Sequence, residues 1–188
     1  MASLMIHLLV GHEYCKNHQV QDVDAFLKGN LAPDFADEKW IAHYSKCKFN
    51  KTYTDSLKTK VDLNRYCREN VIDSDFKRGE FLHLLTDYVF FSQYMLNNPK
   101  YQACDDNNQL GIVKILYRDY HRSNDWIMKS YDGLRLDLLP EEMKATREDE
   151  MEILSKDSLR HMVSFCAGID LNKAYSDYRE NNIDEMEM

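Results

Sequence analysis

An all-α, single-domain fold is what this sequence predicts, from its scarcity of glycine and proline and from its helical periodicity. Six glycines and three prolines among 188 residues amount to about 5%, against about 12% in average proteins. Sandwiches and barrels need a turn residue roughly every ten positions, so the composition excludes them. A hydrophobic content of 44% supports a sizeable core at this length and excludes disordered and low-complexity classes.

The first part of the chain is predicted to form short helices and one polar loop: a helix over residues 5–18, a helix or turn over 20–28, helices over 37–45 and 61–69, and a loop over 46–60. The second helix is expected to end at Gly29-Asn30, a pair typical of left-handed C-caps. Pro33 disfavours a helical residue before it, which predicts a loop over 31–34. Asp37 is expected to cap the third helix.

The strongest helical pattern spans residues 73–96. Apolar side chains recur there at spacings of three and four: Phe76, Phe81, Leu84, Leu85, Tyr88, Phe91 and Met95. Asp73 or Ser74 is expected to cap this helix, and Asn97-Asn98-Pro99 to end it.

Three further helical stretches are predicted in the second half of the chain: residues 108–131, residues 140–166 as one helix or two, and residues 170–180. Pro140 is expected at a first helical position. No internal repeat or linker is found, which predicts one domain over residues 1–182. The acidic tail, residues 183–188, is expected to fray.

The charge balance bears on the class of partner. The formal net charge is −8, which argues against a protein that tracks a nucleic-acid backbone. Twenty of the 32 acidic residues are Asp, a poor residue for helix interiors but a good cap or metal ligand. Acidic side chains gathered around metal ions would be consistent with this bias.

Cysteine usage and hydropathy bear on location. Five cysteines, an odd number without a C-x-x-C pair, suit reduced thiols and a cytoplasmic location, and they provide no thiolate zinc site. The apolar run near the N-terminus is short, is interrupted by His7, and has no basic leader or cleavage site. No stretch approaches the roughly 18 apolar residues of a transmembrane helix. We therefore expect a cytoplasmic protein with no membrane span.

Inside the strongest helical stretch lie His83 and Asp87, four residues apart. This spacing places both side chains on one helical face, where an imidazole and a carboxylate can converge on one metal ion. A plain His–Asp hydrogen bond within the core is the alternative interpretation.

Other residues add to this hypothesis. His7, Asp34 and His43 also lie among apolar neighbours, although each could be an ordinary core His, turn Asp or surface His. Mixed His/Asp sets suit Zn²⁺, with Mn²⁺ and Fe²⁺ as second choices. His121 and Asp125 repeat the spacing of four and could bind a second ion, but their polar surroundings equally suit a solvated segment.

Several segments of the chain follow one another in a recognisable order: MIHLLVGHEY, AFLKGNLAPDF, an HY after a short helix, VDLNRY and GEFLHLLTDYVFF. This ordered set resembles the zinc-dependent phospholipase C superfamily. The family pattern runs T/I-H, F-x-x-G-x-x-A/x-P-D, S-H-F/Y, D-L-x-x-F and G-x-x-x-H-L-L-T-D. The likeness covers about residues 5–96 and points to small, intracellular bacterial members.

The resemblance implies an all-α fold with a metal cluster held between helices. The ligands that it implies are His7, Asp34, His43, His83 and Asp87, the last able to bridge two ions. His121 and Asp125 are similar to the late H-x-x-x-E pair of the family, with Asp in place of Glu. The additional His after the H-x-x-x-D pair has no counterpart here, and Met-Ala-Ser stands where secreted members present a Trp ligand. One or two ions are therefore expected.

The function expected from these residues is metal-dependent hydrolysis of a phosphate ester, with Zn²⁺, or Mn²⁺, Fe²⁺ or Ni²⁺, activating water. Asp34 is the candidate catalytic base, although a ligand role competes with that assignment. A catalytically silent helical scaffold stabilised by metal, and a metal-free protein-interaction module, are the alternatives. The partner expected for the enzyme is a small phosphate-ester substrate.

Overall fold

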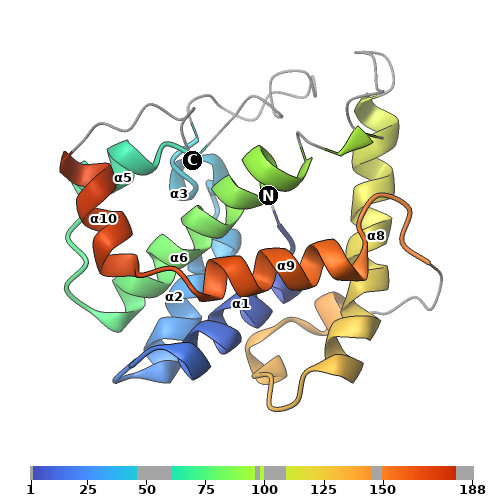
Figure 1. The fold of residues 1–188 in the computed structure, drawn as a ribbon, viewed down its shortest axis with the longest axis horizontal. Coiled ribbons are helices and arrows are strands. Elements are labelled where there is room, and N and C mark those ends of the chain that lie inside the picture. Colours follow the sequence, from blue (N-terminus) through green and yellow to red (C-terminus); the bar gives the residue numbers. More distant parts are fainter. Residues whose placement is uncertain (1, 46–60, 96–97, 100–108, 145–149, 181–188) are drawn as a thin grey trace.

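The computed structural model describes residues 2–45, 61–95, 98–99, 109–144 and 150–180, and they form an all-α fold (Figure 1). Within these ranges the only β pairing is an isolated antiparallel bridge between Ser45 and Val61. The predicted fold class is therefore confirmed. None of the described helices is long and apolar enough to cross a membrane.

Two helices form the centre of the core. Helix α1, Leu4–Asn17, is buried on every side from Leu4 to Gly11, and α6, Asp75–Val89, is buried at every residue from Phe81 onward. Both match predicted helices. A helix that is apolar all round must be covered by neighbours, and here α2, Val23–Phe35, and α9, Lys156–Ala167, pack against α1. Figure 1 shows α9 lying across the front of this group.

The contact between α2 and α6 is very close because each helix presents a glycine to the other. A Cβ on Gly29 would overlap the carbonyl oxygen of Phe76, and a Cβ on Gly79 would overlap the carbonyl oxygen of Phe26. The two backbones therefore touch directly, and any larger residue would separate them.

This contact explains why the loop predicted over residues 31–34 is wrong. Helix α2 continues through Gly29-Asn30 and ends only at Phe35, with Pro33 inside its last turn. Gly29 allows the approach of α6 instead of ending a helix, and Asn30 is fully buried between helices. Packing against α1 and α6 thus outweighs the local cost of Pro33, which removes one backbone hydrogen bond.

Two short helices flank this group. Helix α3 covers only Lys39–Ala42, its N-cap is Glu38, and no side chain caps it, so the capping role predicted for Asp37 is wrong. Helix α5, Leu63–Glu69, agrees with the prediction and is capped by the side chain of Asp62. The loop predicted over 46–60 lies outside the described residues.

The helix predicted over 73–96 divides into two segments. Ser74 is the N-cap, and its hydroxyl accepts a hydrogen bond from the Lys77 amide at 3.3 Å. After Val89 the α-helix passes into a π-helix, η1, Phe90–Met95. Such π segments leave the α-helical register and occur often near functional sites.

The remaining elements are α8, Gln109–Ser130; two 3₁₀ turns, η2, Leu136–Leu138, and η3, Glu141–Lys144; and α10, Leu171–Glu180. Helices α8 and α10 match predictions. A single helix over 140–166 is wrong: Pro140 precedes a 3₁₀ turn, and α9 begins only at Lys156, capped by Ser155. The acidic tail, 183–188, lies outside the described residues.

Candidate metal centre

Five of the seven predicted site residues meet between the helices. They come from four elements, namely α1, α2, the C-terminal end of α3, and α6: His7, Asp34, His43, His83 and Asp87. Within the described residues, two overlapping groups of side chains could hold an ion, and both include His83. One group adds His7 and Asp87, and the other adds Asp34 and His43.

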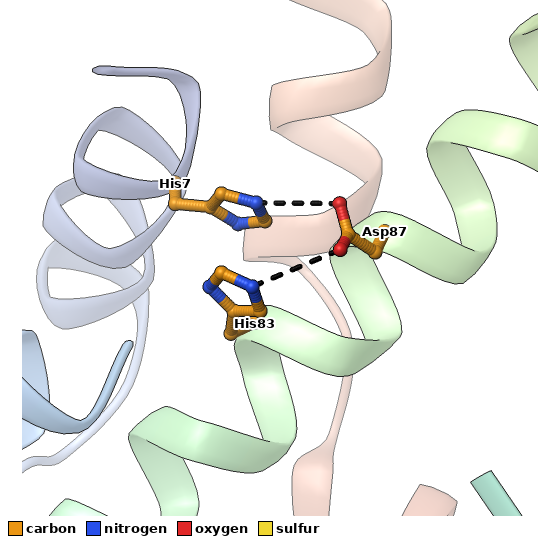
Figure 2. Close-up of side chains that lie close together, drawn as sticks. All are labelled: His7, His83 and Asp87. Carbon is orange, nitrogen blue, oxygen red and sulfur yellow. Dashed lines mark ion pairs between the residues drawn. The ribbon is translucent and has the colours of Figure 1, made fainter. Parts of the chain in front are cut away.

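Helix α6 supplies two of these side chains by its periodicity. His83 and Asp87 lie one turn apart on the same face, with Nε2 and Oδ2 separated by 3.7 Å. Figure 2 shows both of them facing His7 of α1, whose Nε2 lies 3.3 Å from Oδ1 of Asp87. The rings of His7 and His83 stack, with centroids 3.7 Å apart.

Backbone carbonyls orient two of the imidazoles. Nδ1 of His83 donates to the carbonyl oxygen of Asn30 at 2.8 Å, and Nδ1 of His43 donates to that of Lys39 at 2.6 Å. Because a carbonyl oxygen can only accept, both Nδ1 atoms carry the hydrogen, and each ring has a bare Nε2 when it is neutral. Ligating histidines in metalloproteins are held in this way.

The bare nitrogens point toward one another and toward two carboxylates. Nε2 of His83 lies 3.0 Å from Nε2 of His43. Nε2 of His43 also lies 3.4 Å from Oδ1 of Asp34 and 3.6 Å from Oδ2 of Asp87. Neighbouring ligand atoms around a tetrahedral ion with bonds near 2.1 Å are about 3.4 Å apart. These separations are close to those between ligand atoms of one ion, although Asp34 and Asp87 belong to different groups that share His83.

His7 and Asp87 have hydrogen-bonding capacity that the described residues do not satisfy. Neither ring nitrogen of His7 nor Oδ2 of Asp87 has a hydrogen-bond partner there. Oδ1 of Asp87 accepts from the Ala2 amide at 2.6 Å. Unsatisfied polar atoms in a core need an explanation, and a cation among these atoms would provide one.

Asn30 is a positioning residue that sequence reasoning missed. Its side-chain Nδ2 donates to the carbonyl oxygen of His7 at 2.5 Å, and its own carbonyl oxygen holds His83. The residue thus links α1, α2 and α6 directly behind the centre. In the sequence it looked like half of a C-cap pair, and no local signal indicated otherwise.

Burial sets the charge states of the centre. Asp34 is 9% exposed and the other four residues are at most 1% exposed. Burial, reinforced by His7, lowers the pKa of His83 to about 3, which keeps this ring neutral. Burial alone would raise the pKa of both carboxyl groups. For Asp34 the hydrogen bond with His43 and the neighbouring imidazoles outweigh burial, and for Asp87 the charge of the N-terminus and the neighbouring imidazoles do, so each pKa lies below its usual range. Neutral imidazole and ionised carboxylates are the forms that bind metal.

His43 behaves differently. Burial would lower its pKa, but the hydrogen bond with Asp34 and the charge of Asp87 outweigh burial and raise the pKa above 6.5. Without a metal, His43 therefore tends to carry a proton shared with Asp34.

The second predicted pair lies outside both groups. Asp125 forms an i, i+4 ion pair with Lys129 at 2.8 Å, and among the described residues neither it nor His121 joins a metal-binding group. Tyr120 of α8 senses the carboxylates of the centre and is 8% exposed. Burial and the nearby charge of Asp87 raise its pKa well above 10, so its hydroxyl stays protonated. No local sequence pattern distinguishes Tyr120 from an ordinary core residue.

Comparisons with protein-family models, with curated proteins and with solved structures find no match for this chain. The resemblance to the zinc-dependent phospholipase C superfamily therefore stays a prediction from the quoted motifs.

Proposed function

We propose that this protein is a metal-dependent hydrolase of phosphate esters, in which Asp34, His43, His83 and Asp87 hold a divalent cation with His7 beside it. The observation that carries the proposal is the 3.0 Å separation of two Nε2 atoms whose rings are both oriented through Nδ1. Two bare nitrogens repel at this distance unless a cation, either a metal ion or a proton, lies against both.

Two imidazole nitrogens and two carboxylate oxygens are a donor set that suits Zn²⁺. Mn²⁺, Fe²⁺ and Ni²⁺ are the alternatives, because geometry and supply decide among divalent ions more than affinity does. A second observation fits a bound metal. Oδ2 of Asp87 has no hydrogen-bond partner among the described residues and lies 3.6 Å from Nε2 of His43, so one ion could contact both atoms.

When bound, a divalent ion would lower the pKa of a water and neutralise negative charge on a phosphoryl oxygen. His83 is held neutral and in one tautomer by burial and by Asn30, so it keeps its orientation throughout. Asp34 is the most exposed of the five residues, and its ionised carboxylate is the candidate acceptor for the proton of an attacking water.

A second candidate function is a scaffold stabilised by metal without turnover. The burial of His7, His43, His83 and Asp87 favours it, because structural sites are closed whereas catalytic sites keep an open position. Only Asp34, at 9% exposure, offers an approach from solvent.

Metal content and turnover distinguish these functions. We expect about one equivalent of metal per chain after purification without chelator, with wild-type activity on an aryl phosphate ester. His83→Ala and Asp87→Ala should lose the metal and reduce activity about 100-fold or more. His121→Ala is the matched control, because His121 belongs to neither metal-binding group.

Two outcomes would argue against the enzyme. A wild-type chain that binds metal but stays inactive with Zn²⁺, Mn²⁺ and Co²⁺ alike is a scaffold. If the protein binds less than about half an equivalent of each of these metals after reconstitution, it is neither a metal-dependent hydrolase nor a metal-stabilised scaffold. The metal-free protein-interaction module is then the remaining alternative.

We also propose a reducing, cytoplasmic location for this protein. Cys15, Cys67 and Cys166 are free thiols in the structure. Burial raises the pKa of each of them to about 11 or 12, so they are unreactive.

A further inference from the structure

A cavity of about 230 Å³ lies beside the candidate metal centre, between α2, α3, α5 and α6. Its wall contains Pro33, Tyr44 and Leu84, and each of these residues adjoins a proposed metal ligand in the chain. The cavity and the centre therefore share the backbone of three segments. We call this space the side cavity.

Tyr44 is directed to the side cavity by an unusual backbone conformation. Its φ is +50°, in the left-handed region that residues other than glycine seldom adopt. Its ring packs edge-on against Tyr66, with centroids 5.0 Å apart, and its hydroxyl accepts from Nδ2 of Asn70 at 2.7 Å. These contacts hold the strained turn, so that His43 joins the metal centre while Tyr44 lines the cavity.

The lining has an apolar part and a polar end. Alanines, Pro33 and Leu84 form the apolar wall. At the polar end Nζ of Lys77 lies 2.5 Å from Oε2 of Glu80, and the Tyr66 hydroxyl donates to the same oxygen at 3.4 Å. Among the described residues none engages Oε1 of Glu80, so this oxygen can accept a hydrogen bond from a guest.

The size of the side cavity limits the guest. Pockets for drug-sized ligands measure roughly 300–1,000 Å³, whereas a cavity of about 150 Å³ already accommodates a benzene ring. A space of about 230 Å³ accommodates one ring with a substituent, and the rest of a longer acyl chain or a nucleotide would extend out of it.

We infer that the side cavity binds a one-ring organic group bearing a hydrogen-bond donor, and that this group is the organic part of the phosphate ester hydrolysed at the metal centre. The second half of this inference rests on the proposed function, whereas the first half stands without it. Small aryl esters, rather than lipids or nucleic acids, are then the substrate class.

The first test measures binding without turnover. Phenol is titrated into the full-length protein, and ligand-observed NMR reports its affinity. Ala42→Leu and Ala32→Leu place a larger side chain in the cavity wall and should weaken binding about tenfold. Ala25→Leu is the matched control, since Ala25 is also half-buried on α2 but does not line the cavity.

Glu80→Gln examines the polar end separately. Wild-type protein should bind phenol more tightly than toluene, and this preference should shrink in the variant because the amide is a weaker acceptor. Equal phenol affinity in wild type, Ala42→Leu and Ala32→Leu would overturn the binding site.

The second test uses metal-loaded protein with phenyl phosphate and methyl phosphate. Ala32→Leu should lower kcat/KM for the phenyl ester about tenfold more than for the methyl ester, with Ala25→Leu like wild type. If both esters are hydrolysed and Ala32→Leu lowers kcat/KM equally for the two, the proposed substrate class is wrong. The proposed hydrolase function would still stand. Phenol binding without turnover of either ester overturns the hydrolase and the substrate class, and supports the binding site.

Discussion

His83 shows how much of the proposed chemistry depends on single atoms. One of its nitrogens is occupied by the carbonyl oxygen of Asn30, and the other faces His43 at 3.0 Å. A ring with one free lone pair binds one ion, so His83 cannot hold a separate ion with each of the two groups that share it. This single nitrogen therefore limits how the five side chains can divide between ions.

Metal affinity should fall as the pH drops through the raised pKa of His43. Below that pKa the ring carries a proton that the metal must displace, so affinity should decrease by up to about tenfold per pH unit. Calorimetry in buffers of different ionisation enthalpy should show about one proton released per Zn²⁺ at pH 6 and fewer at pH 8. Proton release independent of pH would contradict this expectation.

The same raised pKa affects the stability of the metal-free protein with a definite sign. The folded state binds the proton more tightly than the unfolded chain does. The contribution of His43 to the free energy of unfolding is therefore complete below about pH 6.5 and is lost as the pH rises through the raised pKa.

At the scale of elements, the close approach of α2 and α6 builds the centre. The reciprocal glycines bring Asn30 within hydrogen-bond distance of His83, and Asp34 lies one turn beyond Asn30 on α2. If α2 and α6 were further apart, the carbonyl oxygen of Asn30 could no longer fix the tautomer of His83. The packing between the two helices would be lost as well. Fold stability and site geometry therefore depend on the same contact.

Gly79→Ala should destabilise the protein by about 1–3 kcal/mol, because the added Cβ overlaps the Phe26 carbonyl oxygen and neither backbone can move freely. Urea denaturation measures the free energy, and metal analysis should show weaker zinc retention. Gly168→Ala is the matched control: its nearest neighbour would be 3.2 Å away, and its φ is −92°. Equal effects of the two substitutions would argue against the glycine contact.

A buried carboxylate joins α8 to the segment before α9. Asp119 is fully buried and accepts hydrogen bonds from the amides of Glu152, Ile153 and Leu154 at 2.6–2.9 Å. Asp119→Ala would leave these amides without their acceptor. We expect a loss of about 2–4 kcal/mol in the free energy of unfolding, with the metal retained.

Asp125→Ala is the control on the same helix. Its exposed pair with Lys129 should contribute less than about 1 kcal/mol. Chemical denaturation that shows the two Asp variants equally stable would contradict the role given to Asp119.

For the whole molecule, a metal ion held by the four proposed ligands would cross-link three elements of the chain: α2, the C-terminal end of α3, and α6. Ligand binding stabilises the folded state by about 2.7 kcal/mol at 100 times Kd. A chelator should then lower the Tm of the wild type by about 5–10 °C for a protein of this size. His83→Ala should show no such shift, and a chelator-insensitive wild type would contradict metal binding.

Periodicity predicted the helices that have a clear apolar face or a strong cap. The all-α fold, α1, α8, α10 and the Ser74 cap all follow from residues close in sequence. Predictions failed where a distant backbone outweighed a local preference. Gly29-Asn30 and Pro33 are residues that usually end a helix. They nevertheless lie inside α2, because α6 packs against this part of the helix.

The candidate site divides in the same way. The shared face of His83 and Asp87 follows from the sequence alone, because a spacing of four is one helical turn. The sequence also indicates His7, Asp34 and His43 as polar groups in apolar surroundings. That these three meet the α6 pair, that His121 and Asp125 do not, and that Asn30 orients the site depend on how the helices pack. The reason is physical: local spacing sets the direction of a side chain, whereas the packing of distant helices sets what it meets.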